Sequence, residues 1–204
     1  MKDSCADRQL RGGWLEGALA DGCEFPIEPR NTWSNLAYPL AGWIFYFNHG
    51  SATAWALALA LTALGVGSAL YHGLKTRWAN KLDLFGIYWV FGALLVHGMA
   101  PYAPATPWVM GVAGFVLAAL LVYAIPAVNL DLQVGILLGF STIAACLNGS
   151  WQLALAALGV YLLGFGAWNI DKSHQTWLGL WGHAIWHVLT AIAVPLTFLA
   201  QLRP

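Results

Sequence analysis

The stretch GSALYHGLKTRWANKLDLFGIYWVF, residues 67–91, places three polar side chains in or beside apolar runs. They are Ser68, His72 and Asp83, and the segments around them are typical of helices that face lipid. Ionisable groups at membrane depth are costly, so each needs a partner or a function. This stretch therefore indicates a membrane protein whose helices carry a polar site.

The composition of the whole chain supports this interpretation. Of 204 residues, 59% are hydrophobic and 9% are charged, whereas soluble domains carry about 25% charged residues. The formal net charge is zero, and no basic patch indicates binding to nucleic acid. The cysteines Cys5, Cys23 and Cys146 are widely spaced and predict neither a disulfide framework nor a metal site.

Apolar runs alternate with short polar breaks along the chain, for example KTRWANK at 75–81. A bilayer core of about 30 Å needs about 20 helical residues, and seven runs approach this length. We therefore predict an all-α integral membrane protein, in which a seven-transmembrane-helix bundle (31–204) follows a polar head (1–30). The predicted spans are 31–48, 52–72, 82–100, 106–125, 131–147, 151–168 and 178–200.

Basic residues near the spans predict the orientation of the bundle. Arg203 lies on one side of the predicted bundle, and the other eight basic residues lie on the N-terminal side. We expect a bacterial inner-membrane protein, and for such a protein the positive-inside rule predicts a cytoplasmic N terminus. The eight residues are Lys2, Arg8, Arg11, Arg30, Lys75, Arg77, Lys81 and Lys172.

Short breaks force antiparallel neighbours, so span two ends where spans three and seven begin. His72, Asp83, His183 and His187 should therefore lie on one side of the membrane at similar depth. His183 and His187 are four residues apart and share one stripe of a helix. With His72 they offer three imidazoles and an open position, the form of a catalytic zinc site. Ser68, one turn before His72, can assist an oxyanion, and Asp83 can serve as a base at a helix N terminus.

Each of these residues also has a purely structural interpretation. A single membrane histidine is more often a hydrogen-bonding partner than a ligand, and serine is common at contacts between helices. Asp83 can cap its helix or pair with Lys81 or Arg77. The convergence of three histidines and an aspartate on one face is what favours a metal site.

Four segments together resemble the alkaline ceramidase family, which belongs to a superfamily of seven-span hydrolases that also holds adiponectin-type receptors. The resemblance covers about residues 21–190. It implies a zinc-dependent amidase that cleaves the N-acyl bond of ceramide to a sphingoid base and a fatty acid. The segments are DGCEFPIEPRNTWSNLAYPL (21–40), GSALYH (67–72), KLDLFGIYW (81–89) and HAIWH (183–187).

The same resemblance implies roles for single residues. His72, His183 and His187 would bind zinc, Ser68 would stabilise the oxyanion, and Asp83 would act with the zinc-bound water. We accordingly expect a membrane lipid as the substrate, and neither nucleic acid nor an obligate protein partner. Two alternatives remain open, namely a hydrolase of another N-acyl lipid and a receptor-like protein with structural zinc.

A calcium site in the N-terminal loop is also implied by the resemblance. Its ligands would be Asp21, Gly22 through its carbonyl, Glu24 and Glu28, and oxygen ligands suit a hard cation. Two positions depart from the family pattern. Pro26 stands where a polar ligand is expected, and Gly22 stands where a tryptophan is usual. The alternative is a loop held by arginine and backbone hydrogen bonds without calcium.

Overall fold

A computed structural model describes residues 22–99, 150–173 and 176–201, together with positions 5, 15–18, 20, 112, 115–116, 119, 139, 142–143 and 146. The regular structure of these residues is helical, as the sequence predicts, and they include no strand. The elements are α2 (Leu15–Ala18), α3 (Pro29–Ser34), α4 (Ala37–His49), α5 (Ala52–Leu74), α6 (Arg77–Met99), α9 (Trp151–Lys172), the 3-10 helix η1 (Thr176–Trp181) and α10 (Gly182–Ala200).

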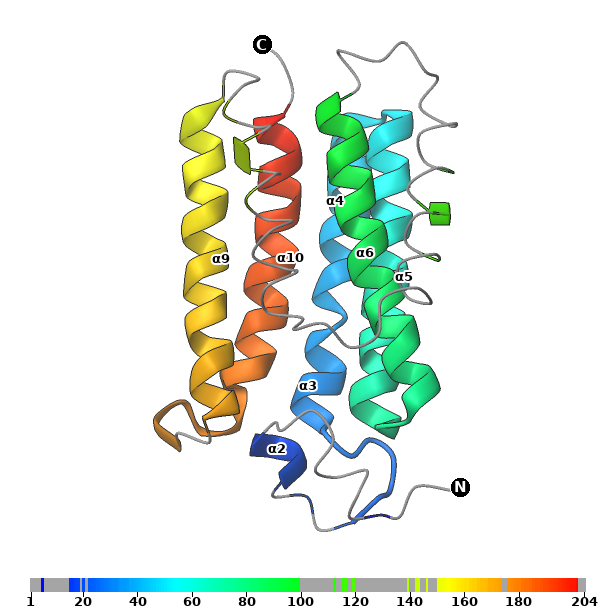
Figure 1. Cartoon of the computed structure of the whole chain (residues 1–204), viewed down its shortest axis with the longest axis vertical. Coiled ribbons are helices and arrows are strands. Elements are labelled where there is room, and N and C mark those ends of the chain that lie inside the picture. Colours follow the sequence, from blue (N-terminus) through cyan, green and yellow to red (C-terminus); the bar gives the residue numbers. More distant parts are fainter. Residues whose placement is uncertain are drawn as a thin grey trace.

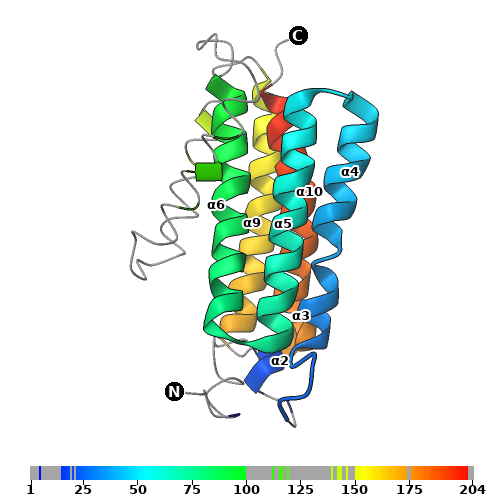
Figure 2. The ribbon, with the colours of Figure 1, turned by 90° about the vertical axis from the view of Figure 1, so that its right-hand side faces the viewer.

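The long helices stand side by side in one bundle (Figures 1 and 2). Helix α5 packs against α4 and α6, α9 packs against α10, and α10 also contacts α4. Apolar side chains of these helices form one core, which includes Phe45, Leu61, Leu94 and Phe198. The end of α5 and the starts of α6 and α10 lie at the same end of the bundle as α2 and α3 (Figure 1).

Among the residues that the structure describes, four helical segments are long and apolar enough to cross a membrane. They correspond to the second, third, sixth and seventh predicted spans and fit a multi-pass membrane protein. The fourth and fifth predicted spans fall almost entirely outside the described residues, so the count of seven stays a prediction. The four segments are Ala52–Leu74, Arg77–Gly98, Trp151–Lys172 and Leu178–Ala200.

The first predicted span, 31–48, is helical but broken. Helix α3 ends at Ser34 and α4 begins at Ala37, which leaves α4 with 13 residues. Large apolar side chains spaced three or four residues apart are exposed along one side of this segment, a pattern that suits contact with lipid. These side chains are Leu36, Leu40, Ile44 and Phe47.

The break predicted at 75–81 is much shorter in the structure. Lys75 adopts a left-handed conformation with φ of 52° and ends α5, and α6 already begins at Arg77. Residues of the RWANK segment are mostly good helix formers, and their polarity does not interrupt the helix. The prediction that Asp83 stands at a helix N terminus is therefore wrong, because Asp83 lies in the second turn of α6.

Two glycines bring α5 and α6 into close contact beside the polar residues. A Cβ atom on Gly67 would lie 2.6 Å from the carbonyl oxygen of Leu82, and one on Gly86 would lie 2.4 Å from the Cα atom of Leu64. Small residues allow helix backbones to approach this closely in membranes. Without these glycines, residues 67–68 of α5 could not lie against residues 82–83 of α6.

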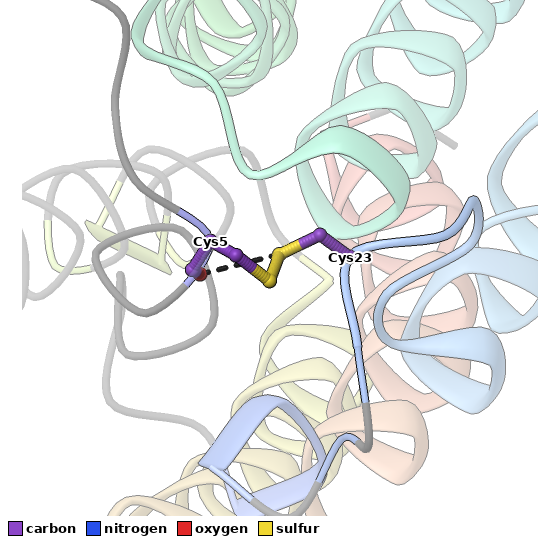
Figure 3. The surroundings of a disulfide bond; sticks show 2 residues. All are labelled: Cys5 and Cys23. Carbon is purple, nitrogen blue, oxygen red and sulfur yellow. Dashed lines mark hydrogen bonds between the residues drawn. A yellow bond between two sulfur atoms is a disulfide. The ribbon is translucent and has the colours of Figure 1, made fainter.

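The N-terminal head contains a disulfide bond between Cys5 and Cys23 (Figure 3). The two Cα atoms are 5.7 Å apart, within the usual range for a disulfide. The sequence analysis, which predicts no disulfide framework, did not foresee this single bond. The 18-residue separation gives no local signal for pairing, and only the folding back of the head brings these cysteines together.

Candidate metal centre

Three histidines from two helices meet inside the bundle. His72 lies near the end of α5, and His183 and His187 lie in the first two turns of α10. Their exposed fractions are 1%, 4% and 3%, respectively. The Nε2 atoms of His72 and His183 are 3.0 Å apart, and one ring nitrogen from each histidine lies within 4.8 Å of the others. The predicted convergence of these three side chains is confirmed.

The cluster has the dimensions of a metal site. Zinc–imidazole bonds of about 2.0–2.1 Å in a tetrahedral arrangement place ligand nitrogens about 3.3 Å apart. The 3.0 Å between the His72 and His183 nitrogens is close to this separation, and none of the three ligand nitrogens lies more than 4.8 Å from another. In the part of the chain that the structure describes, this is the one such group of histidine, cysteine, aspartate or glutamate side chains. The cluster can hold a metal ion, and its nitrogen ligands are of the kind that zinc accepts.

Glu28 and Lys75 form a buried chain behind His72. The Nδ1 atom of His72 is hydrogen-bonded to Oε2 of Glu28, and the Lys75 ammonium donates to Oε1 over 2.7 Å. The Asn31 amide donates to Oε2 over 3.2 Å. Glu28 and Lys75 both have an exposed fraction of 0%. Burial raises the pKa of Glu28, whereas Lys75 and Asn31 oppose this shift by stabilising the carboxylate.

These contacts define the tautomer of two histidines. A carboxylate accepts hydrogen bonds, so Nδ1 of His72 carries the proton and Nε2 keeps its lone pair. Nδ1 of His187 lies 2.7 Å from Oγ of Ser34, and that hydroxyl donates to the carbonyl of Asn31. His187 must then donate from Nδ1, which again leaves the lone pair on Nε2. Such partners commonly orient metal-binding histidines.

Two further carboxylates join the N-terminal head to the base of this cluster. Asp171 of α9 accepts hydrogen bonds from the backbone N–H groups of His183, over 3.0 Å, and Leu15, over 2.9 Å. Glu16 accepts from the backbone N–H groups of Arg30 and Asn31 at the start of α3, both over 2.9 Å. Burial raises the pKa of Glu16, and these two N–H groups oppose the shift. The N-terminal ends of α3 and α10 are thereby fixed relative to each other.

A cavity of about 310 Å³ extends from the histidines into the bundle. Ser68 and Asp83 line it beside the three imidazoles. The rest of the wall is largely apolar. Its apolar residues include Leu64, Ile87, Val90, Phe91 and Val194.

The structure thus brings five predicted site residues to one cavity: Ser68, His72, Asp83, His183 and His187. The catalytic roles of Ser68 and Asp83 stay predictions, because their position alone does not test them. Sequence reasoning missed the residues behind the cluster, above all Lys75, Ser34 and Asp171. Lys75, which the sequence analysis counts among the basic residues that flank the spans, is completely buried.

The predicted calcium ligands are not assembled into one site among the described residues. Asp21 lies outside them, Gly22 is partly exposed and Glu24 is exposed. Glu28 is buried, and its two oxygens contact His72, Lys75 and Asn31. Calcium binding stays a prediction, and Glu28 has partners that the prediction did not foresee.

Comparison with known proteins assigns no family to this chain. No family model matches it, and no curated protein matches it. The resemblance to alkaline ceramidases therefore remains a hypothesis that depends on the residues described above.

Proposed function

We propose that this protein is a membrane-embedded, metal-dependent amidase that hydrolyses the N-acyl bond of a lipid, with ceramide as the expected substrate. The observation that carries the proposal is the single cavity that combines three imidazoles, a serine, an aspartate and apolar walls. A cavity of about 310 Å³ is of the size that holds small ligands. Its apolar wall suits an acyl chain, and its polar end suits an amide.

The chemistry divides between the metal and the side chains. When bound, zinc would polarise the amide carbonyl and lower the pKa of a water molecule. His72, His183 and His187 would hold it as neutral ligands, so that it keeps its full charge. Glu28 and Ser34 would keep two of these imidazoles in the required tautomer.

Asp83 and Ser68 would handle the proton and the developing negative charge. Asp83 accepts a proton as the water oxygen bonds to the carbonyl carbon, and it returns this proton to the nitrogen as the C–N bond breaks. The Ser68 hydroxyl, which lines the cavity beside Asp83, can donate to the carbonyl oxygen and stabilise the oxyanion. The products are a free fatty acid and an amine, which is a sphingoid base if ceramide is the substrate.

The test is release of both products by purified protein in detergent, measured by mass spectrometry on a panel of ceramides, dihydroceramides and other N-acyl lipids. We expect release that a zinc chelator abolishes and added Zn²⁺ restores. Asp83→Asn should keep the metal and lose at least about a hundredfold in rate, the usual contribution of a general base. The control is Ser173→Ala, which changes an exposed polar side chain outside the cavity and should leave the rate unaltered.

Each alternative predicts a different result. Release from other N-acyl lipids but not from ceramides would keep the amidase and change its substrate. One bound zinc per chain without release from any lipid would contradict the proposal and favour a receptor-like protein with structural zinc. A full rate in Asp83→Asn would exclude Asp83 as the base.

A further inference from the structure

Lys75 is a fully buried lysine whose ammonium group lies two contacts away from the histidine cluster. Its Nζ atom is 2.7 Å from Oε1 of Glu28, and the other oxygen of Glu28 bonds His72. Lysine is almost never fully buried without a charged partner. A positive and a negative charge are therefore enclosed together directly behind one candidate metal ligand.

The backbone fixes this arrangement from both sides. Lys75 ends α5 three residues after His72, and its N–H group donates to the carbonyl of Tyr71 over 2.7 Å. The N–H groups of Ile27 and Glu28 donate to the carbonyls of Gly73 and His72 over 3.1 and 3.2 Å. The loop before α3 thus satisfies carbonyls at the end of α5 that the helix itself leaves without partners. Glu28 is held between His72 and Lys75 as a consequence.

We propose that the Lys75 ammonium group is the permanent positive charge of this centre and that it holds the Glu28 carboxylate against His72. Lys75 then occupies the position at this carboxylate that a divalent cation would otherwise take. The inference rests on the proposed metal centre, but not on the lipid substrate. Lys75 is a positioning residue, because it acts on the metal through Glu28 and His72.

Charge compensation explains why a lysine is suited to this position. A buried carboxylate that loses its counter-ion is strongly destabilised, so without Lys75 the Glu28 side chain would not stay in place against Nδ1 of His72. The ammonium balances the carboxylate, so the hydrogen bond orients His72 while the ring stays neutral. The pair as a whole adds no net charge to the site, and a bound Zn²⁺ keeps its power to acidify water. On this account the centre needs no calcium ion at Glu28.

The experiment measures Zn²⁺ affinity of the full-length protein by competition with a fluorescent chelator. Lys75→Met should weaken Zn²⁺ binding about 10- to 100-fold, as is typical when an outer-shell partner is lost. Lys81→Met removes an exposed lysine at the start of α6 and should leave the affinity within about twofold, inside the usual scatter for surface substitutions. Millimolar Ca²⁺ should change the affinity of neither the unaltered protein nor the control.

A double variant separates positioning from a merely structural role, and it applies even if Lys75→Met alone fails to fold. In the Glu28→Gln background both buried charges can be removed together. If Lys75 acts through Glu28, the Glu28→Gln/Lys75→Met double variant should bind Zn²⁺ less than about twofold more weakly than Glu28→Gln alone. The reason is that the effects of coupled residues do not add. A further tenfold loss would overturn the proposal, as would a Ca²⁺ requirement for Zn²⁺ binding in the unaltered protein.

The failures of the two proposals can be told apart. Tight Zn²⁺ binding without amide hydrolysis would overturn the amidase and leave the role of Lys75 intact. Absence of Zn²⁺ binding in the unaltered protein would overturn both. If Lys75→Met left both hydrolysis and Zn²⁺ binding unchanged, only the proposed role of Lys75 would be overturned, and the amidase proposal would stand.

Discussion

Replacement of Gly67 by alanine tests whether the close contact between α5 and α6 positions Ser68 and Asp83, the residues proposed to act in catalysis. A Cβ atom at this position would lie 2.6, 2.7 and 2.9 Å from three backbone atoms of Leu82 and Asp83. Backbone atoms of a packed helix cannot move aside as a flexible side chain can. The two helices must therefore separate next to Ser68 and Asp83.

The size of the effect follows from these distances. Ordinary van der Waals contact begins at 3.4 Å, so relief of the 2.6 Å contact requires a local displacement of about 0.8 Å. Overpacking of this kind typically costs about 1–3 kcal/mol, and the higher helix propensity of alanine returns up to about 1 kcal/mol. The net loss of stability should be modest. A misplacement near 1 Å can cost about a hundredfold in rate, so activity should fall much further than stability.

The assay compares Gly67→Ala with Gly166→Ala, a glycine in α9 whose added Cβ would meet none of the described residues within 4 Å. Thermal unfolding, Zn²⁺ content and lipid amide hydrolysis are measured on both variants in the same detergent. We expect Gly67→Ala to keep the metal and lose about ten- to a hundredfold in rate, while Gly166→Ala matches the unaltered protein. Equal rates in the two variants would refute the view that this helix contact positions Ser68 against Asp83.

Two other substitutions test the metal centre directly by zinc content and affinity. His187→Ala should abolish stoichiometric zinc binding. His49→Ala, which changes an exposed histidine, should leave zinc binding intact. If His187→Ala still bound one zinc per chain, His187 would not be a ligand. Ser34→Ala removes the Nδ1 partner of His187 and should weaken Zn²⁺ binding about 10- to 100-fold. The matched control is Ser173→Ala, which changes an exposed serine whose hydroxyl also donates to the carbonyl three residues earlier. If the two variants bound Zn²⁺ with equal affinity, Ser34 would not be needed to orient His187.

The features predicted correctly from the sequence depend on local patterns. Apolar runs of about 20 residues predict the long helices, and a separation of four predicts that His183 and His187 lie together, as their ring centroids 4.4 Å apart confirm. Antiparallel neighbours then bring His72 to the same end. The start of α6 was mispredicted because the polarity of residues 75–81 suggested a loop, although most of these residues favour helix.

The features that were missed depend on contacts between distant parts of the chain. Lys75 and Glu28 are 47 residues apart, and nothing in the local sequence distinguishes a buried lysine from one at the membrane surface. Ser34 and His187 are 153 residues apart. Glu28 was considered for calcium because acidic loop residues are common cation ligands, but the fold turns its side chain toward the histidines instead.

The disulfide in the head bears on which side of the membrane the chemistry takes place. Disulfides persist in oxidising compartments such as the periplasm and are rare in the cytosol. Cys5 and Cys23 would then face away from the cytoplasm, contrary to the orientation that the basic residues predict. On intact cells carrying Cys146→Ser, an impermeant reductant followed by an impermeant maleimide should label both cysteines. Labelling only after permeabilisation would favour the cytoplasmic N terminus.

An outward-facing head would also decide which lipids the cavity can reach. The histidines lie at the same end of the bundle as the head, so the amide of a substrate would sit near the outer leaflet (Figure 1). Lipids made on the inner face would have to cross the bilayer before cleavage, whereas lipids arriving from outside the cell would meet the site directly. For the proposed amidase, the Cys5–Cys23 bond thus favours lipids of the outer surface as substrates.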